Sequence, residues 1–492
     1  MKAKRILAGL VLSFCVIVLS AQQEKQTFDE YRKEMLNKYD THRRNMLERH
    51  SEYLKGIWKD YQSFIGEKAD MIPKPEKQPV VNSAKGVVLS SPWLLDTVPV
   101  TDTISLNKTD IPLKALSDLP LNKKRVYTFY DLEIELPEIE KEKEPVSFST
   151  LQNISAYWEM MQKKHIGFQW ISGMKEIVST YGFNDWLEVD LVRHCVNQSF
   201  TGGTSETRIV FTHFALVHLG YDVRLGITDT KQLVLLIPFR QMVYGRSFIK
   251  LDGKKYHIYY DELKGREEKT PVISTYEIPE VDKAGKEVDL IFQHPVTLPV
   301  NEWRRFSLTD GQFAIESEVS VTLMKMLSHY PQMPVSCYAV SILQPELRRI
   351  IVEQVKKQVS GLGELEAVNR ILKFVQYAFP YATDSQQFGY EKPFFMEELL
   401  YYPQCDCEDR AVFYAYLLRY VLNLDCHLVK YPGHECVAVR LTCPIEGSGY
   451  IYKGAYYSIS DPTYVGAMTG MCMPDYLHEK PVIECWLHGF FI

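Results

Sequence analysis

Three residues whose side chains can together carry out acyl transfer follow one another near the C-terminal end of the chain. Cys407 stands in the run Cys405-Asp406-Cys407-Glu408-Asp409, His434 follows a glycine, and Asp461 precedes a proline. A thiolate can attack a carbonyl carbon, and an imidazole can take and return its proton. A carboxylate can fix the tautomer of the imidazole and stabilise its cation. The spacing therefore predicts Cys407 as nucleophile, His434 as general base and Asp461 as the acid that orients it.

The residues around Cys407 predict the start of a helix. Pro403 ends any preceding helix, Asp406 is a favourable N-cap, and Asp409 lies three residues further on, as in a capping box. A helix from Cys407 to about Leu422 would place the thiol at the positive end of the helix dipole, which favours thiolate by only about 0.3–1 kcal/mol. The neighbouring carboxylates oppose that effect. We therefore expect the reactive form to be an ion pair with His434.

The same motifs resemble a known family of cysteine enzymes. Cys407-Glu408-Asp409, Gly433-His434 and Asp461-Pro462-Thr463-Tyr464 resemble the transglutaminase-like branch of the papain-type fold. The segment from Phe379 to Tyr464 is similar to transglutaminase-like proteins of the kind secreted by Bacteroidetes-type bacteria. The resemblance implies an α+β papain-like domain with a Cys-His-Asp triad. It departs from the family at Cys405, where many members have a small residue.

The oxyanion donor and the metal content are less constrained by sequence. The backbone N–H of Cys407 is well placed at a helix start to stabilise an oxyanion. A side-chain donor could be Gln387 or Gln404, although both are also ordinary surface residues. The alternative of a zinc site formed by Cys405, Cys407, His434 and Cys436 is disfavoured, because Cys-x-Cys spacing is unusual and a helix turns its two sulfurs apart. The chain has no nucleotide, metal or flavin motif, so we expect neither a metal nor a cofactor.

An earlier segment repeats the pattern without the reactive groups. Ser205-Glu206-Thr207-Arg208 aligns with Cys407-Glu408-Asp409-Arg410, and both runs open an apolar helix followed by two strands. Lys231 and Gln232 stand where His434 stands, and Asp261 corresponds only roughly to Asp461. A serine without a nearby base is a weak nucleophile. This predicts tandem transglutaminase-like domains, of which the first is degenerate.

The N-terminus has the features of an export signal. Lys2, Lys4 and Arg5 precede an apolar run from Ile6 to Leu19, and Ser20-Ala21 provide a cleavage site. Export to the periplasm or the extracellular space is expected, and a lipoprotein or membrane anchor is the alternative. The whole chain, signal peptide included, divides into seven predicted segments. They are a signal peptide (1–21), a long amphipathic helix (22–66), a linker (67–87), a small β module (88–143), the degenerate domain (144–287), a β-rich connecting module (288–350) and the catalytic domain (351–492).

Composition limits the kinds of partner. The net charge of −6 and the hydrophobic content of 46% are ordinary for a globular chain and argue against a nucleic-acid binder. No later apolar run is long enough to span a bilayer. Removal of Cys15 leaves an odd number of cysteines, so at least one thiol should lie outside any disulfide.

The sequence thus predicts an exported cysteine acyl-transfer enzyme, either a peptide or amide hydrolase or a transamidase. Its substrate would be a protein, a peptide or a cell-wall peptide. The N-terminal helix could serve as an oligomerisation stalk or lie along the protein. The competing class is a binding or scaffold protein that keeps the fold without turnover.

Overall fold

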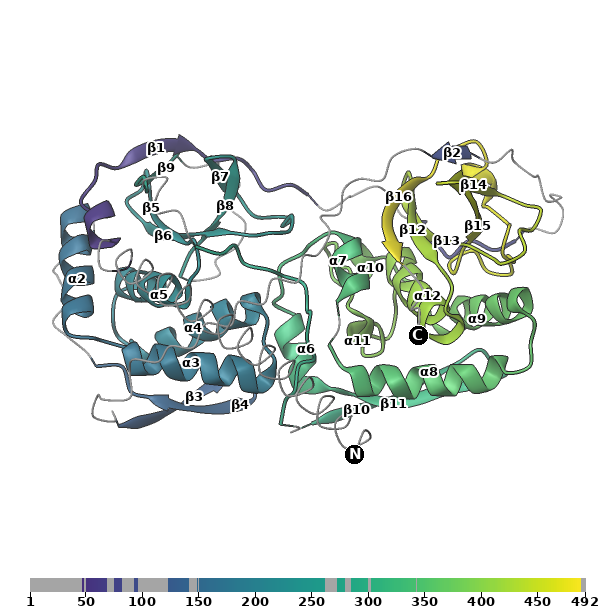
Figure 1. The fold of residues 1–492 in the computed structure, drawn as a ribbon, viewed down its shortest axis with the longest axis horizontal. Coiled ribbons are helices and arrows are strands. Elements are labelled where there is room, and N and C mark those ends of the chain that lie inside the picture. The colour runs from purple at the N-terminus through teal and green to yellow at the C-terminus, as the bar shows by residue number, and fades with distance from the viewer. Residues whose placement is uncertain are drawn as a thin grey trace, which may run out of the picture.

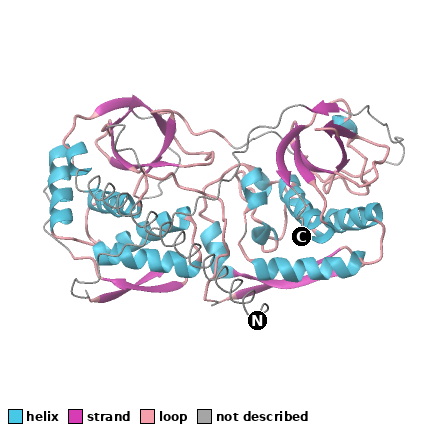
Figure 2. Cartoon of the chain, viewed as in Figure 1, coloured by secondary structure: helices cyan, strands magenta, loops and turns pink. Residues whose placement is uncertain are grey.

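The fold is a mixed α and β structure of two lobes that lie side by side (Figure 1). The computed structural model describes residues 47, 50–68, 75–81, 93–95, 123–140, 148, 150–261, 272–278, 285–299, 302–341 and 343–487 of the 492-residue chain. In each lobe a curved, barrel-like sheet lies at one end, helices fill the middle, and a two-stranded hairpin covers the other end (Figure 2). The α+β class is confirmed, whereas the signal peptide lies outside the described residues.

The N-terminal lobe begins with a hairpin, continues through helices and ends in a meander of strands. Its elements in chain order are β3 (Lys124–Phe129), β4 (Leu132–Pro137), α2 (Leu151–Lys163), α3 (Phe168–Tyr181), α4 (Asp185–Ser199), α5 (Ser205–Leu219), β5 (Arg224–Thr228), β6 (Leu233–Pro238), β7 (Phe248–Leu251), β8 (Lys254–Tyr259) and β9 (Val272–Thr275). The sheet has the order β1-β9-β5-β6-β8-β7, with β1 (Lys59–Gln62) at one edge.

The C-terminal lobe follows the same plan. Its elements in chain order are β10 (Trp303–Thr309), β11 (Ala314–Ser320), α6 (Val321–Leu327), α7 (Val335–Val340), α8 (Pro345–Val359), α9 (Glu364–Ala378), α10 (Asp384–Gln387), α11 (Met396–Leu399), α12 (Cys407–Leu422), β12 (Cys426–Tyr431), β13 (His434–Val439), β14 (Gly449–Tyr452), β15 (Ala455–Ser460), the 3₁₀ turn η2 (Pro474–Tyr476) and β16 (Val482–Leu487). Its sheet has the order β16-β12-β13-β15-β14-β2, so five strands match those of the first lobe in connection and order.

The core of the C-terminal lobe explains how the site residues are held. Helix α12 is buried along most of its length, and it packs against α9 and against one face of the sheet. On β13, Val437 and Val439 face this helical core, whereas Cys436 and Ala438 face the interior of the barrel-like sheet. Because side chains alternate along a strand, His434 shares the barrel side and Glu435 the helix side. The side chains of His434 and Glu435 therefore lie on opposite sides of the sheet.

The long helix expected over residues 22–66 is wrong beyond Tyr53. Most of the segment before His50 lies outside the described residues. The described helical residues end at Tyr53, whose carbonyl accepts the N–H of Gly56. Strand β1 follows, and it pairs antiparallel with β9, with Tyr61 opposite Ile273. The edge of the sheet offers unpaired backbone groups, and pairing with them overrides the helical periodicity of the segment.

Three other predicted segments make contacts that the sequence did not indicate. In the linker 67–87, the described residues 75–81 lie against the C-terminal lobe, where the N–H of Val81 donates to Val465 at 2.9 Å. The β module 88–143 is not one unit, because β2 (Trp93–Leu95) pairs in parallel with β14 whereas β3 and β4 pack on α3 and α4. Within 288–350 the paired strands are β10 and β11, and the segment continues as helices α6, α7 and the start of α8. The prediction of one β module over 88–143 is wrong because β2 pairs with the distant β14, a contact that local patterns do not encode. The β-rich prediction for 288–350 holds only for β10 and β11.

None of the helices in the described part of the chain has the length and apolar character needed to cross a membrane.

Candidate functional site

Cys407 is the first residue of α12, as expected from the capping signals. The N–H of Asp406 donates to Oδ2 of Asp409 at 3.4 Å, and Oδ1 of Asp409 accepts the N–H of Phe394 at 2.9 Å. The Asp406–Asp409 box thus closes the helix start and ties it to the segment before α11. Cys407 is only 1% exposed, so its thiol lies under the surface of the lobe.

His434 and Asp461 form a buried pair. Nε2 of His434 lies 2.8 Å from Oδ2 of Asp461, and both residues are almost fully buried. The other oxygen of Asp461 accepts the N–H groups of Thr463 at 2.8 Å and Tyr464 at 3.2 Å, which fixes the carboxylate. Nδ1 of His434 is buried and has no hydrogen-bond partner among the described residues. This nitrogen is therefore available to a thiol or a substrate.

A tight turn places His434 at the start of its strand. The turn between β12 and β13 contains Gly433 with φ of +72°, a conformation that L side chains rarely adopt. Tyr431 pairs with His434 across the turn. The glycine noted in the Gly433-His434 motif thus has a defined role in fixing the direction of the imidazole.

Tyr476, which the sequence did not single out, connects the three residues. Its ring is stacked on His434, with 5.4 Å between ring centroids and an interplanar angle of 4°, and on Tyr431 at 5.0 Å. Burial raises the pKa of Tyr476 to about 12, and the nearby Cys407 and Asp461 add to the shift. The thiol and the carboxylate therefore both lie within electrostatic reach of the phenol that covers His434. A single tyrosine in a chain with 31 of them carries no sequence signal.

Besides Tyr476, the thiol of Cys407 has Glu408 as a neighbour. It donates a hydrogen bond to Oε2 of Glu408, over 3.4 Å between sulfur and oxygen, and Glu408 is buried. A carboxylate in that place favours the protonated thiol. The neighbouring Asp409 is engaged with backbone N–H groups, so Glu408 is the carboxylate that the thiol contacts.

Gln376 of α9 holds the loop that carries Asp461. Its Nε2 lies 3.1 Å from the carbonyl oxygen of Asp461, 2.8 Å from that of Tyr464 and 3.0 Å from that of Ala467. Its Oε1 accepts the N–H of Gly466 at 3.2 Å. Gln376 follows Val368 and Leu372 at intervals of four residues, on the buried stripe of the helix. A polar residue on an apolar stripe is a sequence signal that could have found it.

The remaining predicted site residues lie elsewhere. Cys405 precedes the helix in a bridge with Tyr381, and burial raises its thiol pKa to about 12. Gln404 is exposed, in contrast to the buried Cys407. Gln387 ends α10, and its amide oxygen is buried without a hydrogen-bond partner among the described residues. The side-chain oxyanion donor therefore remains a prediction.

In the described part of the chain, the side chains that could hold a metal are carboxylates, with Cys407 in one group, and they do not form the set Cys405, Cys407, His434 and Cys436. Within the described ranges, the groups of ligand atoms that converge within 4.8 Å are Asp406–Cys407–Glu408, Asp384–Asp406–Asp409 and Asp384–Glu391–Glu408. No disulfide joins the nine cysteines that the structure describes.

The N-terminal lobe carries other residues in the corresponding positions. Ser205 begins α5 as Cys407 begins α12. On β13, Val437 pairs with Ser460, and Val437 lies three residues after His434. On β6, Leu235 pairs with Tyr259 and lies three residues after Gln232. By this register Gln232 takes the position of His434, and Tyr260, the residue after Tyr259, takes that of Asp461.

The sequence alignment pairs Asp261 with Asp461, but the strand register shows that Asp261 is not its counterpart. It lies one residue later, and its carboxylate binds the guanidinium of Arg208, with Nε at 2.8 Å. Arg208 and Arg410 occupy the same helical position in the two lobes, yet Arg410 donates to the carbonyl of Phe379 at 2.6 Å instead. The carboxylate of Asp261 is thus bound by Arg208, and the positions of His434 and Asp461 are taken by Gln232 and Tyr260, which supply neither an imidazole nor a carboxylate.

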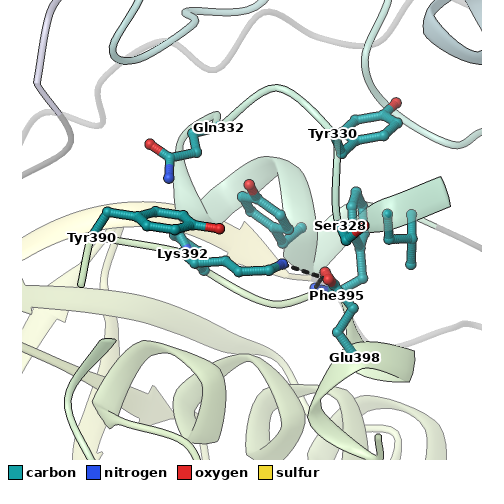
Figure 3. Close-up of a pocket in the computed structure, with 10 residues that line it drawn as sticks. Ser328, Tyr330, Gln332, Tyr390, Lys392, Phe395 and Glu398 are labelled. Carbon is teal, nitrogen blue, oxygen red and sulfur yellow. Dashed lines mark hydrogen bonds and ion pairs between the residues drawn. The ribbon is translucent and has the colours of Figure 1, made fainter. Parts of the chain in front are cut away.

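A pocket elsewhere in the C-terminal half contains a buried ion pair. Figure 3 shows the side chain of Lys392 reaching to Glu398, with Tyr390 beside Lys392 and Gln332 above them. Nζ of Lys392 lies 2.5 Å from Oε1 of Glu398, and it also faces the rings of Phe394 and Tyr402. The charges of the pair compensate each other, so the pocket shows no reactive group comparable to Cys407.

Comparison with known proteins gave no match, either to a family model or to a curated sequence.

Proposed function

We propose that the chain is an exported, transglutaminase-like cysteine enzyme of the papain-type fold that transfers or hydrolyses acyl groups. The observation that carries the proposal is the buried pair of His434 and Asp461, which leaves Nδ1 of His434 for a thiol. Tyr476 supports it, because its phenol lies on His434 and within electrostatic reach of Cys407. The N-terminal lobe would be a degenerate copy, with Ser205, Gln232 and Tyr260 in the positions of the triad.

The residues divide the chemistry between them. Cys407 attacks the carbonyl carbon of an amide, and Nδ1 of His434 takes the thiol proton. Asp461 accepts the hydrogen bond from Nε2 and stabilises the imidazolium. The backbone N–H of Cys407 stabilises the oxyanion at the start of α12. His434 returns the proton to the leaving amine, and water or a second amine then resolves the thioester.

Access is the main requirement that the closed site imposes. Cys407 is 1% exposed and His434 is 4% exposed, so a substrate carbonyl reaches the sulfur only after a local opening. Tyr476 is the natural moving part, because it belongs to a three-residue turn and covers the imidazole. The proposed substrate is a protein or peptide chain, including a cell-wall peptide.

Active-site labelling tests the proposal. The purified protein would be treated with iodoacetamide at neutral pH, and the modified cysteine would be located by mass spectrometry. We expect Cys407 to react before every other cysteine, and Cys407→Ser to lose all turnover of a peptide mixture. The matched variant Cys405→Ser should keep at least about a tenth of the activity, because its thiol lies outside the helix. The reverse pattern would contradict the assignment of the nucleophile.

The competing proposal is a binding or scaffold protein that retains the triad. The hydrogen bond from Cys407 to Glu408 favours it, because that contact stabilises the unreactive thiol. Slow labelling of Cys407, no faster than that of the exposed Cys443, would support this alternative.

A further inference from the structure

Carboxyl groups gather around the start of α12. Glu408 is buried beside the sulfur of Cys407, and its carboxylate oxygen lies within 4.8 Å of those of Asp384 and Glu391. Like charges so close together repel one another unless a cation or a proton lies between them. The surroundings of the proposed nucleophile are therefore suited to positive charge.

Two further carboxyl groups belong to the same region of the lobe. Glu435 follows His434 on β13, and Glu484 is the extra residue of a β-bulge where β16 pairs with β12. The two side chains are hydrogen-bonded to each other and share a proton. Burial raises the pKa of both carboxyl groups, and the charge of Glu408 raises them further. The pair therefore lies within electrostatic reach of Glu408.

The outer oxygens of this pair lack partners. Oε1 of Glu435 and Oε2 of Glu484 are buried, and neither has a hydrogen-bond partner among the described residues. Glu435 itself is only 5% exposed. Buried carboxyl oxygens are normally hydrogen-bonded, so two adjacent exceptions indicate a missing donor. Lys430 pairs with Glu435 across the strands and supplies one positive charge against three carboxyl groups.

We propose that Glu408, Glu435 and Glu484 form a subsite beside Cys407 for an ammonium or guanidinium group of the substrate. The inference rests on the proposed function, because it takes Cys407 as the reacting group. A substrate cation would donate to the outer oxygens of Glu435 and Glu484 and displace the proton that the pair shares. It would thereby hold a carbonyl or an amine near the sulfur.

The arrangement suits an organic cation better than a metal ion. A bound metal ion needs ligand atoms that converge on one point. The converging groups around Glu408 contain Asp384 and Glu391, but neither Glu435 nor Glu484. Donors that are spread over an ammonium or a guanidinium group can reach oxygens that do not converge. The cation can belong to the acyl donor, as a basic side chain near the reacting carbonyl, or to an amine acceptor.

Alkylation with reagents of different charge tests the subsite without a known substrate. Rates at Cys407 would be measured with 2-bromoethylammonium, iodoacetamide and iodoacetate, and each would be divided by the rate with glutathione. In the parent, the cationic reagent should be favoured over the neutral one, and the anionic reagent disfavoured. In the double variant Glu435→Gln with Glu484→Gln, the cation-to-neutral ratio should fall at least about fivefold. Glu479→Gln, an exposed acid shortly before β16, is the matched control and should leave the ratio unchanged.

The possible failures are distinguishable. If no reagent labels Cys407, the proposed function fails. If all label it with a ratio that the double variant does not change, the subsite alone is overturned. If the double variant does not fold, Glu484→Gln alone should lower the ratio, because Glu484 is the less buried partner. Calcium that slows all three reagents equally, and does so only in the parent, would assign the carboxyl groups to a metal and also overturn the proposal.

Two organic cations test the subsite further and identify the source of the cation. Pentylamine should slow alkylation of the parent by 2-bromoethylammonium more than pentyltrimethylammonium does, because only pentylamine in its protonated form has N–H donors for the outer oxygens. If pentylamine is incorporated into a peptide digest supplied as acyl donor, the subsite serves the acceptor. If modified or cleaved peptides instead carry Lys or Arg beside the reacting carbonyl, it serves the donor. The absence of protection by pentylamine would contradict the proposal.

Discussion

Nε2 of His434 lies 2.8 Å from Oδ2 of Asp461, and this contact leaves the other ring nitrogen, Nδ1, for chemistry. An Asp461 carboxylate can accept only from a protonated Nε2, so the neutral ring keeps its lone pair on Nδ1. The same carboxylate stabilises the cation after Nδ1 has taken a proton. The pair therefore prepares His434 for a general-base role before any substrate arrives.

Replacement of Asp461 by Asn should change the pH–rate profile. The imidazolium loses its stabilising partner, so the upper limb of kcat/KM should move to lower pH, and the maximum should fall at least about tenfold. The profile would be measured with a peptide substrate, or with iodoacetamide if none is known. An upper limb identical to that of the parent would show that Asp461 does not orient His434. The exposed Asp475, in η2, would then be the next acid to test.

Gln376→Leu should weaken the site without touching its reacting atoms. The change removes the donor to the carbonyl oxygens of Asp461, Tyr464 and Ala467, and it leaves buried polar groups unpaired. We expect a loss of about 1–3 kcal/mol in unfolding free energy. We also expect a lower kcat, because the Asp461 loop is no longer held.

The matched control is Gln358→Leu, which lies at an exposed position of α8. Urea unfolding and the pH–rate profile would be compared for the two variants. Equal, small effects of both would contradict a positioning role for Gln376.

Glu408→Gln should make the thiol of Cys407 more reactive toward neutral reagents. The parent thiol donates to a carboxylate at 3.4 Å, which favours the protonated form, whereas an amide oxygen is a weaker acceptor. The pH at half-maximal alkylation by iodoacetamide should fall by about one unit, if the contact is worth about 1.4 kcal/mol. Asp409→Asn is not an equivalent test, because Asp409 accepts the N–H groups of Asp406 and Phe394. An unchanged or higher midpoint for Glu408→Gln would show that the contact does not control the thiol.

The parts of the site that sequence could predict are those with local signals. Pro403, Asp406 and Asp409 mark a helix start within a few residues, and the observed bounds of α12 follow them. The alternating residues after His434 mark a strand in the same way. The roles of Cys407, His434 and Asp461 in turnover stay predictions, although the structure pairs His434 with Asp461.

The parts that escaped depend on contacts between distant residues. Glu435 and Glu484 meet only because β16 pairs with β12 through a bulge, and no local pattern fixes that register. Tyr260 takes the position of Asp461 because of the pairing of Leu235 with Tyr259, whereas alignment by residue type had chosen Asp261. The sequence of strand β1 predicts helix, because its pairing with β9 is likewise a long-range effect.

Glu435→Gln should stabilise the protein in a pH-dependent way. Burial, and then the neighbouring Glu484, raise the pKa of Glu435 above its unfolded value of 4.5, so the folded state holds a proton that the unfolded state has lost. Stability of the parent should therefore fall as pH rises above 4.5, and the loss is complete only above the raised folded-state pKa. Glutamine keeps the shape and carries no titratable proton, so the variant should gain about 1 kcal/mol or more over the parent at pH 8.

Urea unfolding at pH 5 and pH 8 measures this difference. The gain of Glu435→Gln should shrink toward pH 5, where the parent also keeps its proton. Because Glu484 shares the proton, the pair titrates as a unit, and some pH dependence should remain in the single variant. Glu446→Gln, an exposed acid of the same lobe, should show the same offset from the parent at both pH values. A gain for Glu435→Gln that is equal at both pH values, or larger at pH 5, would mean that Glu435 is ionised in the folded protein.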